Sequence, residues 1–140
     1  LKFYEDFDVF KIFPLDVGLL GAMTDVPASK LLVGDNCFSE FKGAFTECYV
    51  NEQLARIQIP TYYFSGNDTE IEIDFAVQTE NRVIPIEVKS EESVRSKSLK
   101  TYIDKNPSLK GLRVSMKNYI DQGWMENIGL YAIEGFLRKS

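Results

Sequence analysis

Residues 72–90, EIDFAVQTENRVIPIEVKS, decide the fold, because two stretches of alternating apolar and polar residues are separated by TENR at 79–82. Alternation at a period of two is typical of β-strands with one buried face. We therefore expect strands over 71–78 and 83–89, joined as a hairpin by a turn at 79–82. The apolar residues expected on the buried face are Ile71, Ile73, Phe75, Val77, Ile84, Ile86 and Val88.

The polar residues of the hairpin predict a cluster of charges at one end of a sheet. Glu87 and Lys89 are two residues apart in a strand and should share a face. Asp74, thirteen residues before Glu87, would be brought beside it if the strands pair. The chain's other Glu-x-Lys, at Glu40 and Lys42, opens a predicted helix, where residues two apart diverge. The hairpin therefore predicts two carboxylates and one ammonium in one place.

The rest of the chain predicts alternating helices and strands around this hairpin. The clearest helix covers 39–56, with Ser39 available as its N-cap. Its expected buried stripe is Phe41, Phe45, Cys48 and Ala55. Other expected elements are a strand over 8–13, a short helix from Pro14 to near Gly21, an irregular stretch or short helix over 24–36, a strand over 61–65, a turn over 66–68, a basic helix over 92–105, strands over 111–116 and 127–133, and a helical tail. From residue 39 onward, the order helix, three strands, helix, strand predicts an α/β sandwich with a right-handed parallel crossover.

Pro85 lies within the strand predicted over 83–89 and breaks its series of backbone hydrogen-bond donors. Proline has no backbone N–H to give to a ladder, so we expect an edge strand or a bulge there.

Composition narrows the chemistry. A chain of 140 residues with 44% hydrophobic and 26% charged residues is expected to form one soluble domain. It has no His, which excludes Ser-His-Asp and Cys-His nucleophiles and His-bound zinc. Carboxylates, Lys and Tyr remain, with hard, oxygen-binding metals. Cys37 and Cys48 lack metal-ligand spacing and are expected to be small buried residues in a reducing cytosol.

No membrane or secretion signal is visible in the sequence. No apolar run approaches the ~20 residues of a membrane span. The first ten residues are acidic where a secretory signal would be basic. We therefore expect a cytoplasmic protein, and the initial Leu suggests a fragment of a longer chain.

The charge is unevenly distributed along the chain. The net charge is −5, but residues 89–117 hold eight basic and three acidic groups. Such a stretch can contact phosphates despite the acidic total. A solvated helix face explains the same pattern, and both interpretations stay open.

The predicted charge cluster suits phosphodiester cleavage. Two carboxylates can hold a Mg²⁺ that keeps several waters, and the metal can polarise a phosphate and activate a water. An ammonium can stabilise charge growing on the phosphate. The alternative is an exposed ion pair on an ordinary hairpin, which contributes about 0–1 kcal/mol.

The order of elements together with EIDF…IPIEVKS resembles the restriction-endonuclease-like, PD-(D/E)xK nuclease superfamily. More closely, FKIFPLDVGLL, KGAFTECYVNEQL, IDF and IPIEVKS, followed by SVRSKSL, resemble an uncharacterised domain at the C-terminal end of prokaryotic AAA-type ATPases. The resemblance runs from Phe10 to about Leu137. It implies a restriction-endonuclease-like core (α-β-β-β-α-β), a mixed sheet flanked by helices, in a domain over 36–140 that follows an N-terminal extension over 1–35.

The resemblance also implies roles for individual residues. Asp74 and Glu87 would bind Mg²⁺ or Mn²⁺ and act in catalysis with Lys89. Glu47 matches the acidic residue that related nucleases present from the first helix, with Glu52 as the runner-up. Glu72 shares a face with Asp74 and is either a partner of it or merely solvated. A polar group on the helix after the Lys strand contributes in some members, which would be Ser96, Lys97 or Ser98 here. The expected DNA contacts are Arg95, Lys97 and Lys100.

The chain also departs from this pattern. Ile73, not Pro, precedes the aspartate, and there is no G-x-x-x-x-G-K-[ST] phosphate loop. ATP would therefore enter only through an ATPase domain upstream. Because some members of the superfamily keep the fold without activity, an inactive nucleic-acid-binding module and a protein-interaction domain remain alternatives.

Overall fold

The computed structural model describes residues 1–25, 39–66, 71–90 and 95–140. Its strands are β1 (Thr61–Ser65), β2 (Glu72–Gln78), β3 (Val83–Val88), β4 (Gly111–Ser115), β5 (Ile120–Asp121) and β6 (Met125–Gly129). Its helices are η1 (Lys2–Tyr4), α1 (Val17–Thr24), α3 (Ser39–Arg56), α4 (Lys97–Lys105), η3 (Leu130–Ala132) and α5 (Ile133–Leu137).

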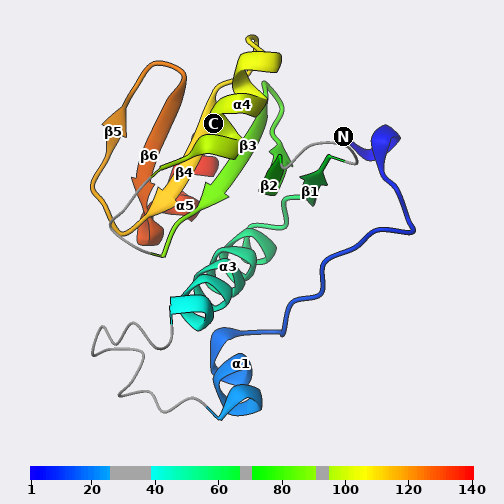
Figure 1. Cartoon of the computed structure of the whole chain (residues 1–140), viewed down its shortest axis with the longest axis vertical. Coiled ribbons are helices and arrows are strands. Elements are labelled where there is room, and N and C mark those ends of the chain that lie inside the picture. Colours follow the sequence, from blue (N-terminus) through cyan, green and yellow to red (C-terminus); the bar gives the residue numbers. More distant parts are fainter. Residues whose placement is uncertain (26–38, 67–70, 91–94) are drawn as a thin grey trace.

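The strands form one mixed six-stranded sheet in the order β1-β2-β3-β4-β6-β5 (Figure 1). β1, β2 and β3 pair antiparallel, β3 pairs with β4 and β4 with β6 in parallel, and β5 pairs antiparallel with β6. Two parallel neighbours need a crossover, and α4 provides it between β3 and β4. This confirms the predicted α/β class, the mixed sheet flanked by helices, and the parallel pairing across the second helix.

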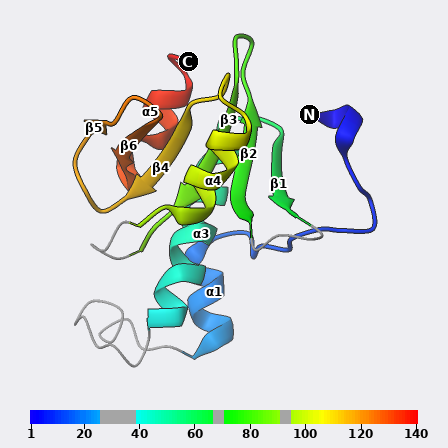
Figure 2. The same ribbon diagram turned by 45° about the horizontal axis from the view of Figure 1, so that its top comes forward.

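Two apolar clusters lie on opposite faces of the sheet. The larger one joins the sheet to α3 and α5; its buried residues are Val50, Leu54, Phe75, Val77, Ile84, Ile86, Val88, Leu112, Val114, Ile128, Ile133 and Leu137. The smaller one joins the sheet to α4 and consists of Ile73, Leu99, Ile103 and Met125. Figure 2 shows α4 lying across the strands. Each such side chain contributes about 1.5–3 kcal/mol by burial, so these clusters fix both helices against the sheet.

An extra residue in β2 changes which face its side chains take. Thr61 and Tyr62 pair with Val77 and Ala76, but Phe64 pairs with Ile73, so two steps along β1 match three along β2. This is the geometry of a β-bulge. As a result Ile73 packs under α4 whereas Phe75 packs toward α3, and the prediction that the two share a face is wrong.

Pro85 lies in an interior strand, so the prediction of an edge position is wrong. The N–H of Lys89 donates to Val114 on β4, and residues two apart in a strand point their N–H groups the same way. The nitrogen of Pro85 therefore faces β4. The ladder between β3 and β4 begins only at Ile86, so the missing donor leaves no broken pair.

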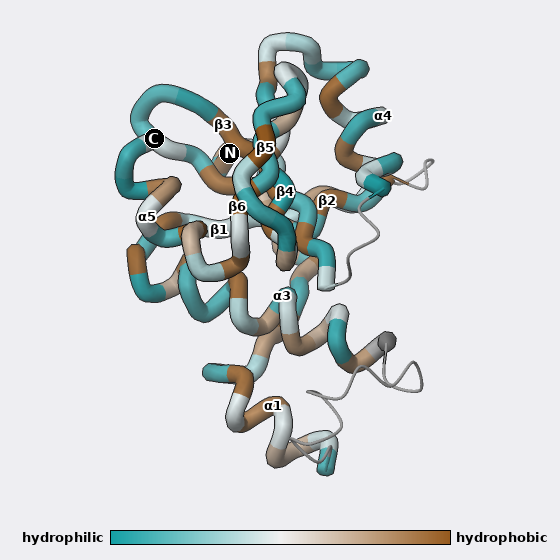
Figure 3. The backbone as a smooth tube through the Cα atoms, turned by 90° about the vertical axis from the view of Figure 1, so that its left-hand side faces the viewer, coloured by the Kyte–Doolittle hydropathy of each residue, from teal (hydrophilic) through white to brown (hydrophobic). Residues whose placement is uncertain are grey.

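The N-terminal segment is not a strand, contrary to the prediction for residues 8–13. It is held by the ring of Phe13, which stacks on Phe75 at 5.6 Å, and by the carbonyl oxygen of Pro14, which accepts a hydrogen bond from Cys48 Sγ at 3.8 Å. α1 begins after Asp16, whose carboxylate accepts a hydrogen bond from the N–H of Leu19, and the helix runs beyond Gly21. The large apolar residues exposed in this region are Phe3, Tyr4, Phe7, Val9, Phe10, Ile12, Leu15, Leu19 and Met23. Figure 3 shows apolar stretches on α1 beside α3.

The helix predicted over 39–56 is confirmed as α3, but of its predicted buried stripe only Cys48 is fully buried. Phe41 and Ala55 are exposed, whereas Cys48, Val50 and Leu54 are buried. The cause is that the C-terminal half of α3 packs on the sheet and its N-terminal half packs against α1.

Smaller differences concern the ends of elements. The last strand covers 125–129, not 127–133, because the chain turns into η3 and α5. The short edge strand β5 was not predicted. Ser39 is the first residue of α3, but its side chain is not described, so its role as N-cap is not tested. Most of the segment 24–36 and of the turn at 66–68 lies outside the described residues, as does the start of the basic helix before residue 95.

Candidate functional site

The end of β3 holds the predicted pair of charges. Lys89 Nζ lies 2.8 Å from Glu87 Oε1, so the two side chains share a face as predicted. Glu87 is only 6% exposed, which does not fit the solvated face of an ordinary hairpin. Its second oxygen, Oε2, is buried and accepts no hydrogen bond from the residues that the structure describes. A buried carboxylate oxygen without a donor is costly, so this atom calls for a ligand or another explanation.

Asp74 lies beside this end of β3, one residue before the paired Phe75 and Ile86. Its Oδ2 accepts a hydrogen bond of 2.7 Å from the N–H of Val88. Burial raises the pKa of Asp74 from its ordinary 3.8 to about 6, and the hydrogen bond from Val88 opposes this rise. The charges of Glu47 and Glu87 raise the pKa further, and Lys11 lowers it. Asp74 therefore responds to charges from α3, from β3 and from the N-terminal segment.

Glu87 lies on the face that α4 covers. A side chain at Gly111 would meet Leu99 of α4, so Arg113, two residues on, faces the same way. Arg113 is the register partner of Glu87. The buried Arg113 guanidinium donates from Nε to Asn127 Oδ1 at 2.7 Å, and burial lowers its pKa, while Glu87 opposes that shift.

Arg113 is one of the eight basic groups counted over residues 89–117, and its interior position removes it from any basic surface. The sequence analysis missed the buried polar row that it forms with Asn127 and Ser115. The one available signal in the sequence was that residues two apart in a strand share a face, which puts Arg113 and Ser115 on the same side.

A second group of charges gathers on the α3 side. Lys11 Nζ lies 3.3 Å from Glu72 Oε1 and 3.8 Å from Glu47 Oε2. The same ammonium lies 5.3 Å from the centre of the Tyr63 ring, a cation–π distance. Sequence reasoning missed Lys11, because it precedes Glu47 by 36 positions and its charge alone carries no signal. Its position inside the apolar stretch FKIF was the one available indication.

The structure thus pairs Glu87 with Lys89, and the charges of Glu47 and Glu87 both act on Asp74. Glu47 shares Lys11 with Glu72 on the α3 side, and Asp74 lies between the two groups. Glu52, the alternative to Glu47, contributes instead to the raised pKa of Cys48, which burial dominates. Among the described residues, no three His, Cys, Asp or Glu side chains are grouped so that they could hold a metal ion.

The predicted DNA contacts surround the start of α4. Arg95 and Lys97 are exposed, and Lys100 is exposed but pairs with Asp104. Lys100 also lies 5.4 Å from the centre of the Trp124 ring. Two of the three predicted side chains therefore present their charge to solvent without a described ion pair.

The serines before and within α4 differ in environment. Ser96 is buried and its Oγ has no hydrogen-bond partner among the described residues, whereas Ser98 is half-buried. Neither contacts Lys89 or Glu87 through a described hydrogen bond.

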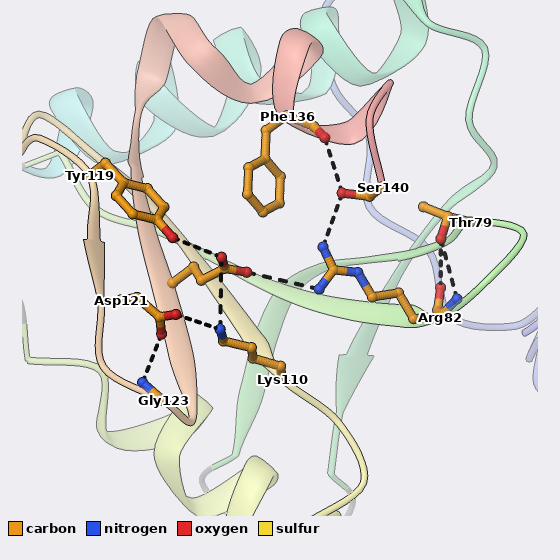
Figure 4. A network of polar contacts seen from close by, with 9 residues as sticks. Thr79, Arg82, Lys110, Tyr119, Asp121, Gly123, Phe136 and Ser140 are labelled. Carbon is orange, nitrogen blue, oxygen red and sulfur yellow. Dashed lines mark hydrogen bonds and ion pairs between the residues drawn. The ribbon is translucent and has the colours of Figure 1, made fainter.

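Part of the basic stretch is used in a structural network around Glu126 (Figure 4). Tyr119 donates to Glu126 at 3.1 Å, and Lys110 and Arg82 lie 3.8 and 3.9 Å from its carboxylate. Arg82 also donates to the hydroxyl of Ser140. This network ties β6, the hairpin turn and the end of the chain together.

Comparisons with known proteins give one match. The family model described as "Domain of unknown function (DUF4143)" matches residues 42–132, which include the whole hairpin and α4. No curated protein and no solved structure matches the chain. Within the described ranges, no helix has the length and apolar character needed to cross a membrane.

Proposed function

Because the chain belongs to the family described as a domain of unknown function (DUF4143), found at the C-terminus of AAA-type ATPases, we propose that it is the nuclease-like module of such an ATPase. In this proposal it hydrolyses DNA phosphodiesters with the help of Mg²⁺ or Mn²⁺. The restriction-endonuclease-like core and the link to an upstream ATPase domain are parts of the same proposal.

The observation that carries the proposal is the unpaired, buried Oε2 of Glu87 beside the desolvated Asp74. Lys89 occupies the other oxygen of Glu87, and Val88 occupies one oxygen of Asp74. One oxygen of each carboxylate is thus left for a cation. Such a donor set suits Mg²⁺, which is usually held by one or two carboxylates and keeps its waters.

Each residue of this group has a role in the proposal. Asp74 and Glu87 would hold the metal, which when bound supplies a polarised phosphate and a more acidic water. Lys89 lies next to Glu87 and would stabilise negative charge on the phosphate. The exposed Arg95 and Lys97 would bind the backbone of the nucleic acid.

The test is cleavage of plasmid and oligonucleotide DNA with Mg²⁺ or Mn²⁺ by the wild type, Asp74→Asn and Lys89→Ala. Either substitution should lower the rate at least ~100-fold, the usual effect of removing one charge-stabilising group. Matched controls are Glu80→Gln and Lys105→Ala, which change exposed charges elsewhere. Equal cleavage by the wild type and both site variants would overturn the proposal.

A second function is favoured by the lack of a three-carboxylate group in the described part of the chain. An inactive relative of the same fold would bind DNA through Arg95 and Lys97 without metal. Salt-sensitive binding with no cleavage at any metal concentration would support this function over the first.

A further inference from the structure

The first fifteen residues present a series of apolar side chains to solvent. Among the other described residues, only Tyr131 has a large apolar side chain that is at least 70% exposed. A soluble domain rarely leaves so many apolar residues uncovered, and aromatic residues are enriched where proteins meet. We call this group the N-terminal apolar surface; its residues are Phe3, Tyr4, Phe7, Phe10, Ile12 and Leu15, which are between 70% and 93% exposed.

The segment is anchored on one side and open on the other. Lys11 and Phe13 contact side chains of β1 and β2, and the carbonyl of Pro14 accepts a hydrogen bond from α3. Phe10 and Ile12 alternate with these anchors and are exposed. Such alternation is that of a strand with one covered side, whose outward residues are normally polar when they face water. The anchors therefore hold an apolar side outward.

The backbone of the same stretch is also open. In the part of the chain that the structure describes, residues 10–13 donate no backbone hydrogen bond and pair with no strand of the sheet. Exposed apolar side chains next to open backbone donors suit a partner that adds a strand or offers an apolar groove. The stretch runs along the β1 side of the molecule in Figures 1 and 2, so a partner there would leave α4 uncovered.

The charges of the segment restrict the chemistry of that partner. Glu5, Asp6 and Asp8 are exposed among the apolar residues. Acidic groups are repelled by anionic lipid headgroups, which attract basic segments instead. They fit a protein surface whose apolar centre is surrounded by basic side chains.

We propose that the N-terminal apolar surface docks on the ATPase domain of the same polypeptide, at an apolar site with a basic rim. The inference rests on the upstream ATPase domain of the proposed function, and it does not depend on whether the chain cleaves DNA. Residues 1–15 are the part of the chain that such a domain would join. A short tether gives an effective concentration on the order of millimolar, at which even a weak interface stays closed.

The experiment compares amide hydrogen exchange in the isolated chain and in the full-length polypeptide that contains it. The amides of residues 10–13 should exchange at least ~10-fold more slowly in the full-length polypeptide, because exchange then requires the interface to open. Phe10→Ser combined with Ile12→Ser should remove this protection. The matched control is Met116→Ser combined with Tyr131→Ser, which replaces two exposed apolar side chains elsewhere and should leave the protection unchanged.

The wild-type comparison needs no variant, and the double variant should keep the urea midpoint of the isolated chain because both side chains are exposed. Equal exchange in the two wild-type forms, or protection that survives Phe10→Ser with Ile12→Ser, would overturn the inference and leave the proposed nuclease function standing. Protection that grows with the concentration of the isolated chain would identify a second copy as the partner, and protection that requires phosphatidylglycerol vesicles would identify a membrane; either result also overturns the inference.

Two outcomes separate this inference from the proposed function. If the full-length polypeptide contains no ATPase domain, the inference and the proposed ATPase link both fail. If residues 10–13 are protected in the full-length polypeptide but no form cleaves DNA, the inference is supported and the proposed nuclease activity is rejected.

Discussion

Replacing Asp74 by Asn should make the protein more stable at neutral pH, although it should abolish the proposed activity. Burial raises the pKa of Asp74 from 3.8 to about 6. At about 1.4 kcal/mol for each pKa unit, this rise corresponds to about 3 kcal/mol. The cost belongs to the charged form, so the asparagine removes it. Its amide oxygen can still accept the hydrogen bond from Val88.

The sign of the pH dependence follows from the same shift. A carboxyl group whose pKa is higher in the native state binds its proton more tightly there than in the unfolded chain. Below about pH 4 the carboxyl group of Asp74 is protonated in both states and does not lower the free energy of unfolding. Between about pH 4 and pH 6 it lowers that free energy increasingly, and above about pH 6 the loss is complete. The stability gain of Asp74→Asn should be largest near neutral pH and should vanish toward about pH 4.

Urea denaturation of the wild type and Asp74→Asn at several pH values measures this difference directly. Glu80→Gln removes an exposed carboxylate of the hairpin turn and should change stability by less than about 0.5 kcal/mol. The reasoning is refuted if Asp74→Asn is no more stable than the wild type near pH 7.5, or if the difference does not depend on pH.

Three further predictions address packing, buried hydrogen bonds and charge. The buried amide of Asn127 accepts two hydrogen bonds through its oxygen and donates two through its nitrogen. Asn127→Ala removes all four and should lower the free energy of unfolding by about 2–4 kcal/mol in urea denaturation. A loss under about 1 kcal/mol would contradict a stabilising role for this amide. Gly111→Ala places a methyl group 3.0 Å from a buried leucine of α4 and should cost about 1–3 kcal/mol, whereas Gly43→Ala, with open space around it, should be neutral or stabilise by up to about 1 kcal/mol. If DNA binds, replacing Arg95 and Lys97 together by Ala should reduce the slope of log affinity against log salt by about 2, measured by fluorescence anisotropy, and an unchanged slope would exclude these contacts.

The hairpin and the pairing of its charges could be predicted because they depend on local pattern. Period-two alternation over 72–90 was enough to place Glu87 and Lys89 on one face, and the short turn brought Asp74 near them. The bulge could not be predicted, since it arises from the register of β1 against β2 and leaves the alternation of the sequence intact. It is the bulge that separates Ile73 from Phe75.

Long-range contacts account for the other misses. Lys11 reaches the site from a segment that forms no strand, so no periodicity points to it. The buried stripe of α3 depends on which side of its C-terminal half packs on the sheet, and that packing buries Leu54 and leaves Ala55 exposed. Arg113 was counted with the surface charges because a single basic residue among strand residues does not reveal which neighbour it faces.

The extra residue in β2 makes a single strand contact helices on both faces of the sheet. Residues before it rest against α4 through Ile73, and residues after it rest against α3 through Phe75. Asp74 lies between Ile73 and Phe75, where the strand changes the face that it packs. Since α4 contacts β3 and β4 as well as β2, a displacement of α4 would act together on the strand that carries Asp74 and the strand that carries Glu87.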